Sequence, residues 1–219
     1  MAYDFDTIAR TYDRLNRVMT FGLDRRWRKH AVRRLHGNVL DVACGTGDMV
    51  MELAKQGCHV TGVDISEQML EIAKQKTASA NYQLSTVNYQ LCNAEALPFA
   101  DGEFDAVTCA FGVRNFVHLE LGLYEMLRVM KPGGTMVILE LATPDSVIIR
   151  PFYNLYTKHI IPWLGNRIAG NRDAYTYLPE SIAHFPKGKE MLRILENVGF
   201  KAKQKKIFFG VCRMYLSIK

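Results

Sequence analysis

One short segment constrains the fold of this chain more than any other: an apolar run with an acid near its end, followed by two glycines. Val39–Val42 predicts a buried strand, Gly45 and Gly47 let the backbone turn tightly, and apolar residues then recur at helical spacing. A second apolar run ends on Asp64. A strand, a glycine loop, a helix and a second strand that ends in a carboxylate form a nucleoside-binding pattern, because the carboxylate suits both ribose hydroxyls.

The residues around the glycines indicate which nucleoside is bound. A dinucleotide fingerprint has Gly or Ala three positions after its second glycine, whereas this chain has Val50 there. Asp41, near the end of the first strand, would repel a pyrophosphate but attract the ammonium of a methionine moiety. The pattern therefore favours S-adenosylmethionine. A nicotinamide-dependent reductase and a noncatalytic adenosylmethionine-binding regulator are the alternatives from other classes.

Strands and helices alternate along the rest of the chain. We expect a helix from Ser66 to about Lys76, helices at 119–129 and 188–198, strands at 89–92, 104–110 and 135–141, and a terminal hairpin from 201–209 and 211–218. Residues 131–134 should end a helix before the strand that follows. This predicts an α/β fold with a Rossmann-like doubly wound sheet, mostly parallel with a terminal antiparallel hairpin. The acid, the glycine loop and the second acid resemble the pattern of class I methyltransferases, so we expect the class I methyltransferase fold.

Ligands of such sheets bind outside the carboxyl ends of the strands. The candidate cofactor-binding residues therefore follow the ends of the first four strands: Asp41, Gly45, Thr46, Gly47, Asp64, Asn93, Ala94 and Ala110. Glu140, which ends the fifth strand, would line the same crevice or cap a turn.

Length and composition predict a single methyltransferase domain over 1–219, with an N-terminal helical cap at about 1–36 and an apolar lid insertion at about 143–182. The 219 residues are 48% hydrophobic and include no Pro/Gly/Ser-rich linker. The five cysteines are odd in number and lack a C-x-x-C pair, so we predict neither a disulfide framework nor a metal site. No apolar run approaches the roughly 18 residues of a membrane span. Residues 1–10 contain acidic side chains and do not have the pattern of a signal peptide. We expect a cytoplasmic protein.

The net charge of +6 comes largely from two clusters, at 25–34 and 201–206. A solvated helix face and a charged strand edge explain each cluster alone. Peripheral contact with the inner face of the membrane is the second interpretation. No nucleic acid partner is expected, because aromatic and basic residues are not interleaved as in base-stacking modules.

Several stretches outside the glycine loop resemble the UbiE-type quinone C-methyltransferase family, which acts in menaquinone and ubiquinone biosynthesis. The matching stretches cover most of the chain: 5–9 with Tyr12-Asp13, 16–27, 41–48, 93–99, 111–115 and 173–182. The Phe-Gly-x-Arg-Asn run at 111–115 is more specific than the glycine loop. Departures are Ala110, where family members often have serine or asparagine, and Pro179, where a small residue is usual.

The resemblance implies roles for particular residues. Thr46, Asp64, Asn93 and Ala94 match positions that contact S-adenosylmethionine, and Tyr12 with Arg25 would lie near its methionine end. Arg114 and Asn115 match the active-site pair. The implied reaction is C-methylation of a demethylmenaquinol, a polyprenyl hydroquinone, with a ubiquinone-pathway methoxy-benzoquinol as the alternative substrate.

C-methylation needs a carbon nucleophile, and an oxidised quinone ring is electrophilic, so the substrate must be the hydroquinone. Arg114 suits stabilisation of its phenolate, with Asn115 orienting the oxygen. Arginine is a poor base at neutral pH. His118 is a candidate base, because a helix continuing from Arg114 would put both on one face, although a surface or capping role explains it too.

The predicted lid is too apolar for an ordinary solvent loop. Apolar residues crowd 148–164, where Pro151 and Pro162 should break the chain into short pieces. We expect it to enclose a polyprenyl tail, with Phe152, Trp163, Tyr175 and Tyr177 as candidate substrate contacts. Packing over the sheet and a homodimer surface are the alternatives.

Overall fold

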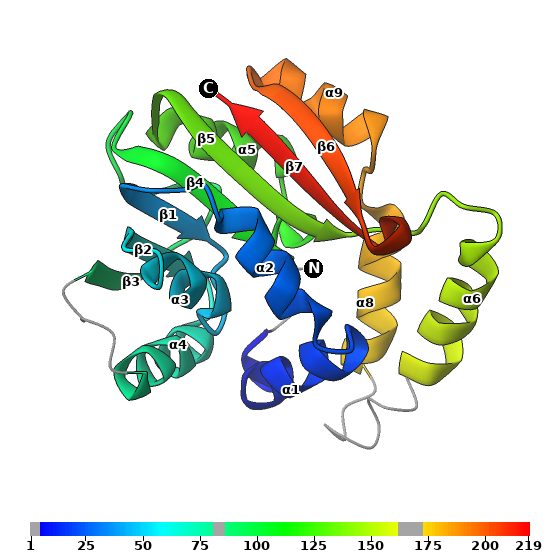
Figure 1. The fold of residues 1–219 in the computed structure, drawn as a ribbon. Helices are drawn as coiled ribbons and strands as arrows, with labels where there is room; N and C mark the ends of the chain where they lie inside the picture. The colour runs from blue at the N-terminus through cyan, green and yellow to red at the C-terminus, as the bar shows by residue number, and fades with distance from the viewer. Residues whose placement is uncertain (1–4, 81–85, 162–172) are drawn as a thin grey trace.

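The computed structural model describes residues 5–80, 86–161 and 173–219, with side chains from residue 6 and, in the last range, from 179. These residues are built around one seven-stranded sheet of order β3-β2-β1-β4-β5-β7-β6 (Figure 1). The strands are β1 Asn38–Val42, β2 His59–Asp64, β3 Val87–Leu91, β4 Phe104–Ala110, β5 Met130–Leu141, β6 Lys201–Ile207 and β7 Cys212–Ile218. Only β7 runs antiparallel to its neighbours β5 and β6 within the pairings of this sheet. The predicted fold class is confirmed.

Helices cover both faces of the sheet and its carboxyl edge. In chain order they are η1 Phe5–Ile8, α1 Ala9–Met19, α2 Leu23–Val32, α3 Asp48–Ala54, α4 Glu67–Ser79, η3 Val113–Asn115, α5 Leu119–Val129, α6 Ile149–Leu155, the π-helical turn η4 Tyr156–Ile160, α8 Asp173–His184, α9 Lys189–Val198 and η5 Phe208–Gly210. Ser66 caps α4 as predicted, accepting a hydrogen bond from the Met69 N–H. None of the described helices is long and apolar enough to cross a bilayer.

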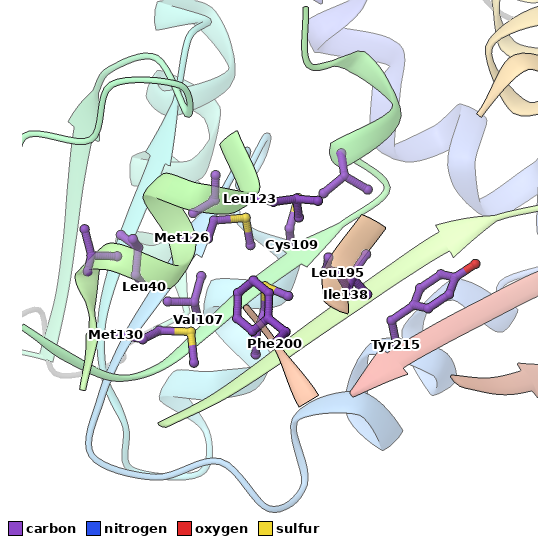
Figure 2. Close-up of a cluster of buried hydrophobic side chains, with 14 of the residues drawn as sticks. Leu40, Val107, Cys109, Leu123, Met126, Met130, Ile138, Leu195, Phe200 and Tyr215 are labelled. Carbon is purple, nitrogen blue, oxygen red and sulfur yellow. The ribbon is translucent and has the colours of Figure 1, made fainter. Parts of the chain in front are cut away.

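The core forms two layers because side chains alternate along each strand. In β5, Met136 and Ile138 point to the layer covered by α5 and α9, whereas Val137 and Leu139 point to the layer covered by α2 and α3. Figure 2 shows the first layer, where Leu123 and Met126 of α5 meet strand residues such as Val107. Both faces of the central strands are buried, which explains their nearly continuous apolar sequences.

Strand β5 differs from the prediction, because it begins at Met130 and not at residue 135. The segment at 131–134 follows the end of the helix as predicted, but it belongs to the strand, whose register with β4 shifts at a bulge: Phe104 pairs with Met130 and Ala106 pairs with Thr135. Gly134 permits this geometry: a Cβ there would lie 2.9 Å from the Lys131 carbonyl oxygen. A bulge retains the pairing with β4 on both sides, so the strand continues through sequence that resembles a turn.

The lid insertion begins with a helix that continues through Pro151. The prediction that this proline breaks the chain is wrong, because Pro151 is the third residue of α6, where its missing N–H has no partner in the helix anyway. The chain continues without interruption into η4. Helices α1, α6 and α8 gather beyond the carboxyl edge of the sheet (Figure 1). Pro162 lies outside the described residues.

Candidate active site

A cavity of about 120 Å³ opens at the carboxyl ends of β1, β2, β3 and β4, where the sequence predicts the nucleoside. Its lining includes five of the predicted site residues, namely Tyr12, Gly45, Asp64, Asn93 and Ala94, together with Asn115 of the predicted catalytic pair. Chain segments far apart in sequence therefore converge on one crevice, as the topology of a doubly wound sheet requires.

Asp64 holds the glycine loop in place. Its Oδ2 accepts a hydrogen bond from the Gly45 N–H at 2.8 Å, and its Oδ1 accepts one from the Ser66 N–H at 2.9 Å. Burial raises the pKa of this carboxyl group, and these backbone donors oppose the rise. Because each carboxylate oxygen has a second lone pair, Asp64 can still accept two ribose hydroxyls.

Gly47 lets the backbone of the loop turn, as predicted. It has a φ of 81° and caps α3, and a Cβ there would lie 2.7 Å from the Tyr89 hydroxyl. It lines neither this cavity nor the smaller one beside it. Its role in the described part of the chain is to let the loop turn against Tyr89, and a direct cofactor contact stays a prediction.

A smaller cavity of about 20 Å³ adjoins the first and contains charges of both signs. Tyr12 and Gly45 line both cavities, while Asp41, Thr46, Ala110 and Arg28 are added here. Asp41 Oδ1 accepts a hydrogen bond from Thr108 at 2.6 Å, whereas buried Oδ2 has no hydrogen-bond partner among the described residues. Burial raises the pKa of Asp41 to about 7.

Arg28 occupies the place that the family resemblance gives to Arg25. Arg25 is exposed on α2, whereas Arg28 is buried, lines the small cavity and lies 4.9 Å from the Phe111 ring centroid. One turn of helix separates the two, and only the Trp27–Arg28 side of α2 faces the sheet. Arg28 Nη1 donates to Asp24 at 2.6 Å, which leaves the other guanidinium donors without a hydrogen-bond partner in the described residues.

Thr46 fastens the loop to the N-terminal cap. Its Oγ1 donates to Asp13 Oδ1 at 2.5 Å, and Lys76 Nζ donates to Asp13 Oδ2 at 2.7 Å and to Asp48. Helices α1, α3 and α4 are thus joined behind the cofactor loop. The Thr46 hydroxyl also accepts a hydrogen bond from Lys76 at 3.3 Å, and a cofactor contact of Thr46 stays a prediction.

Arg114 lies in a buried ion pair with Glu140. Its Nη1 is 2.6 Å from Glu140 Oε1 and also donates to the Phe111 carbonyl oxygen at 2.6 Å. The Arg114 backbone N–H is 3.3 Å from Glu140 Oε2. The sequence placed Glu140 at the end of a strand, but nothing in the pattern predicted its partner. The pair holds the guanidinium in one position and balances its charge in a dry environment.

A second cavity, of about 240 Å³, is almost wholly apolar. It lies between the N-terminal helices, the lid and the hairpin turn, and its lining includes Phe21, Trp27, Phe152, Tyr153, Tyr156 and Phe208. Phe152 is 70% exposed and borders the opening. Residues of the lid thus form one wall of an apolar hollow, and its occupation by a hydrophobic tail stays a prediction.

The nucleoside cavity and the apolar cavity are neighbours, because residues that line one pack against residues that line the other. The Arg114 charge acts on two buried phenols: Tyr12, which lines the nucleoside cavity, and Tyr153, which lines the apolar one. Burial raises the pKa of both hydroxyls, that of Tyr153 to about 12, and Arg114 opposes the rise. Trp27 of the apolar cavity also meets Phe111 of the nucleoside cavity edge-on at 6.5 Å.

His118 is not placed as predicted. The helix expected to continue from Arg114 stops at Asn115, Phe116 is extended, and α5 begins only at Leu119. The His118 side chain is 71% exposed and its Nδ1 lies 2.8 Å from Glu95 Oε2. It therefore does not share a helix face with Arg114 and lines none of the three cavities described above.

The structure does not describe the side chains of the remaining predicted substrate contacts. Trp163 lies outside the described residues, and the Tyr175 and Tyr177 side chains also lie outside them, although α8 includes both positions. Tyr153 and Tyr156 line the apolar cavity instead, and the sequence analysis missed both roles. A helical spacing of Ile149, Phe152, Tyr153 and Tyr156 on one side of the lid was the available signal.

Comparison with known proteins identifies the family. The model of the ubiE/COQ5 methyltransferase family matches residues 2–219. The chain belongs to this family. The "Ubiquinone/menaquinone biosynthesis C-methyltransferase UbiE" of Geotalea daltonii is 42% identical, over 98% of this chain and 94% of that protein. The "Demethylmenaquinone methyltransferase" of Deinococcus radiodurans is 41% identical, over 98% of this chain and 90% of that protein.

A solved structure extends the likeness to the fold. A SAM-dependent methyltransferase from Aquifex aeolicus superposes with a TM-score of 0.65 at 19% identity, covering 90% of this chain and 91% of that one. This ubiE/COQ5 family member is thus an S-adenosylmethionine-dependent C-methyltransferase with a class I fold. The site fits the cofactor. Asp41 Oδ2 is buried without a hydrogen-bond partner among the described residues, and the ammonium group of S-adenosylmethionine would supply one.

Proposed function

We propose that this enzyme methylates a ring carbon of a demethylmenaquinol, giving menaquinol and S-adenosylhomocysteine. The observation that supports this most strongly is an apolar cavity next to the nucleoside cavity: Trp27 of the first packs against Phe111 of the second, and the Phe111 carbonyl accepts a hydrogen bond from Arg114. A prenylated hydroquinone has a polar ring and an apolar tail, so it matches a site where a buried cation adjoins a hydrophobic hollow.

Three charged residues would each bind a different part of the cofactor. Asp64 would accept the ribose hydroxyls, Asp41 would neutralise the methionine ammonium, and Arg28 would pair with the methionine carboxylate. Asn93 and Ala94 line the same cavity beyond Asp64. The bound cofactor supplies an electrophilic methyl group on a sulfonium.

Arg114 acts on the substrate ring. Loss of a proton from one hydroxyl pushes negative charge onto the neighbouring ring carbon, and Arg114 stabilises the phenolate that carries this charge. That carbon takes the methyl group as the methyl–sulfur bond breaks, and loss of its own hydrogen restores the aromatic ring and the hydroxyl. One proton is released overall. Asn115, which lines the nucleoside cavity beside Gly112, would orient the phenolate oxygen.

Glu140 keeps Arg114 in position for this role. A mobile arginine would lose side-chain entropy each time that it bound the phenolate, whereas the 2.6 Å bonds to Glu140 and to the Phe111 carbonyl fix it beforehand. Arginine remains protonated at neutral pH, so Arg114 stabilises charge and does not abstract the proton. His118 is exposed, is bound to Glu95 and lines none of the three cavities described above, so it is not preferred as the base.

The apolar cavity would hold the first isoprenoid units of the tail. Phe152, Tyr153 and Tyr156 of the lid face Trp27 and Phe21 of the N-terminal cap across it. Trp163, Tyr175 and Tyr177 stay predicted contacts of the same substrate. We also propose that the enzyme is a cytoplasmic protein that meets its prenylated substrate at the inner face of the membrane.

A methoxy-benzoquinol of the ubiquinone pathway is the second candidate, because the Geotalea relative is named for both pathways. The test is to incubate the purified protein with methyl-labelled S-adenosylmethionine and each reduced substrate, then to analyse the products by mass spectrometry and NMR. We expect a labelled methyl group on a ring carbon of the naphthoquinol. Label only on the benzoquinol would favour the second candidate, and label on oxygen or on neither would contradict C-methylation of quinols.

A further inference from the structure

A third cavity, of about 400 Å³, lies on the sheet face between α2 and the terminal hairpin and belongs to no part of the site described above. On one side it is lined by His30 in the last turn of α2 and by Arg33 and Arg34 just after this helix, and on the other by Lys203 and Lys205 of β6. Met214 and Leu216 of β7 form its floor. We call it the basic groove.

The positive charges of the basic groove are not neutralised by the protein. No acidic residue is among those lining it, and none of Arg33, Arg34, Lys203 and Lys205 forms an ion pair with a described residue. Lys205 Nζ lies 3.1 Å from His30 Nε2. Burial lowers the pKa of His30, and the neighbouring Lys205, Arg33 and Arg34 lower it further. Such an accumulation of like charge favours an anionic partner.

The same two elements lead from the basic groove to the opening of the apolar cavity. Trp27 of α2 lines the apolar cavity, whereas His30 lines the groove one turn later. On the hairpin, Phe208 lines the apolar cavity and Lys205 lines the groove, a separation of about 10 Å along an extended chain. Trp27 and Phe208 pack together, with ring centroids 6.2 Å apart.

Large apolar side chains are exposed around that opening. Phe208 and Phe209 have positive φ angles of 46° and 56°, a conformation that is rare for residues other than glycine, and Phe209 is 71% exposed. Val147, Ile148 and Phe152 at the start of the lid are exposed as well. A strained turn that presents an aromatic ring to solvent beside an apolar opening needs an explanation beyond packing.

We propose that the basic groove and this apolar rim together dock the enzyme on a bilayer that contains anionic lipid, with lipid phosphates in the groove and Phe209 in the headgroup boundary. A bilayer presents negative charge and hydrocarbon within a few ångströms of each other, as this surface presents cations and apolar side chains. The inference deepens the proposed function and rests on it, since docking here brings the apolar cavity to the membrane in which a prenylated quinol is dissolved.

The test is co-sedimentation of the purified protein with vesicles of phosphatidylcholine alone, or with about one-third phosphatidylglycerol. The triple variant Arg34→Gln/Lys203→Gln/Lys205→Gln should bind the anionic vesicles at least roughly tenfold more weakly than the wild type, because each basic residue strengthens binding severalfold. The matched control is Lys187→Gln/Lys189→Gln/Arg193→Gln on and beside α9, which covers the other face of the sheet. It removes the same residue types and the same charge, and it should bind as the wild type does.

A second variant tests the apolar rim. Phe209→Ser should lower the affinity for both kinds of vesicle, because it removes an apolar ring from the headgroup boundary. The thermal melting temperature should stay unchanged, because the ring is exposed to solvent in the folded protein. Wild type that sediments with neither vesicle, or equal weakening by the two triple variants, would overturn the proposal. So would light scattering that shows a dimer whose formation the groove variant abolishes.

The proposed function is checked separately. Methylation of a short-tailed, water-soluble demethylmenaquinol without vesicles should be the same in the wild type and the groove variant. Absence of that activity would contradict the proposed function, whereas normal activity without vesicle binding would contradict the docking surface alone.

Discussion

Asp41 makes the clearest prediction at the scale of single residues. Its pKa is raised to about 7 in the folded protein, so the folded state holds this proton more tightly than the unfolded chain. The contribution of this carboxyl group to the free energy of unfolding is fully present below about pH 4 and is lost as the pH rises through about 7. The ligand-free wild type should lose on the order of 4 kcal/mol over this window. Asp41→Asn should lose much less, as measured by urea unfolding at a series of pH values.

The matched control is Asp105→Asn, because Asp105 is also a strand aspartate but has the opposite shift. A hydrogen bond from Lys131 lowers its pKa, so its stabilisation is present above the unfolded pKa and is lost as the pH falls. Equal pH profiles for the wild type and Asp41→Asn would contradict the account of Asp41. In addition, cofactor affinity of the wild type should rise with pH through about 7, because only the carboxylate neutralises an ammonium group.

Asp64→Ala should weaken S-adenosylmethionine binding by about 1.5 to 3 kcal/mol, the range for hydrogen bonds to a charged group. The change also removes the acceptor for the Gly45 N–H, so the loop loses a support as well as the ribose contact. Isothermal titration calorimetry measures the loss. Unchanged affinity, or tighter binding of a nicotinamide cofactor by the wild type, would mean that the nucleoside was identified wrongly.

Arg114→Ala should depress turnover far more than it depresses cofactor affinity, since the proposed role of Arg114 is to stabilise the substrate phenolate. Arg114→Lys should fail as well, because the shorter lysine side chain does not bring its ammonium group to the place where Arg114 Nη1 bonds both Glu140 and the Phe111 carbonyl. Steady-state rates combined with cofactor calorimetry separate these effects. Normal turnover of either variant would remove Arg114 from the mechanism.

The sequence predicted the residues at strand ends well but not those that reach the site from elsewhere. Asp64, Asn93 and Ala94 line the nucleoside cavity because parallel strands end at one edge. Arg28 was missed in favour of Arg25, since a sequence pattern does not say which side of α2 faces the sheet. Glu140 was seen as a strand end, but its pairing with Arg114 depends on how the segment at 111–115 folds back.

At the scale of elements, the lid makes a prediction about substrate length. If the apolar cavity holds isoprenoid units, affinity should rise with each unit added until the cavity is filled, by at most roughly 0.8 kcal/mol per buried CH₂. Phe152→Ser should flatten this dependence while leaving cofactor affinity intact, because Phe152 lines only the apolar cavity of the two. Titration of tail-length variants measures it, with a thermal melt of each protein as the control.

Loss of both ligands together with a lower melting temperature would indicate that Phe152 serves packing and not substrate binding. Its 70% exposure argues against such a packing role. If the substrate affinity of the wild type did not depend on tail length, the lid would have no role in binding the tail.

The strands and helices were predictable where one physical signal dominated. Strand β4 and helix α5 were predicted to the residue, since continuous apolar sequence and 3.6-residue spacing define them. Strand β5 was predicted to begin at residue 135 and not at Met130, because Pro and Gly at 132–134 are typical of chain breaks as well as of bulges. His118 was placed on a helix with Arg114 because spacing alone does not reveal that Phe116 is extended.

At the scale of the whole molecule, the sheet order follows from alternating elements, but the meeting of two cavities does not. The nucleoside cavity is built by strand ends, while the apolar one joins residues from α1, α2, the lid, α8 and η5. These segments lie far apart in the chain and have no shared periodicity, so only the folded structure brings Trp27 of the apolar cavity against Phe111 of the nucleoside cavity.

The central claim is that this junction methylates the carbon of a reduced ring. The most direct measurement compares, without oxygen, single-turnover methylation of demethylmenaquinol and of the same molecule left oxidised. Only the hydroquinol should react, because only its phenolate places negative charge on a ring carbon that can attack, and NMR should find the new methyl group on that carbon. Comparable rates with the oxidised quinone, or a methyl group on oxygen, would contradict the account.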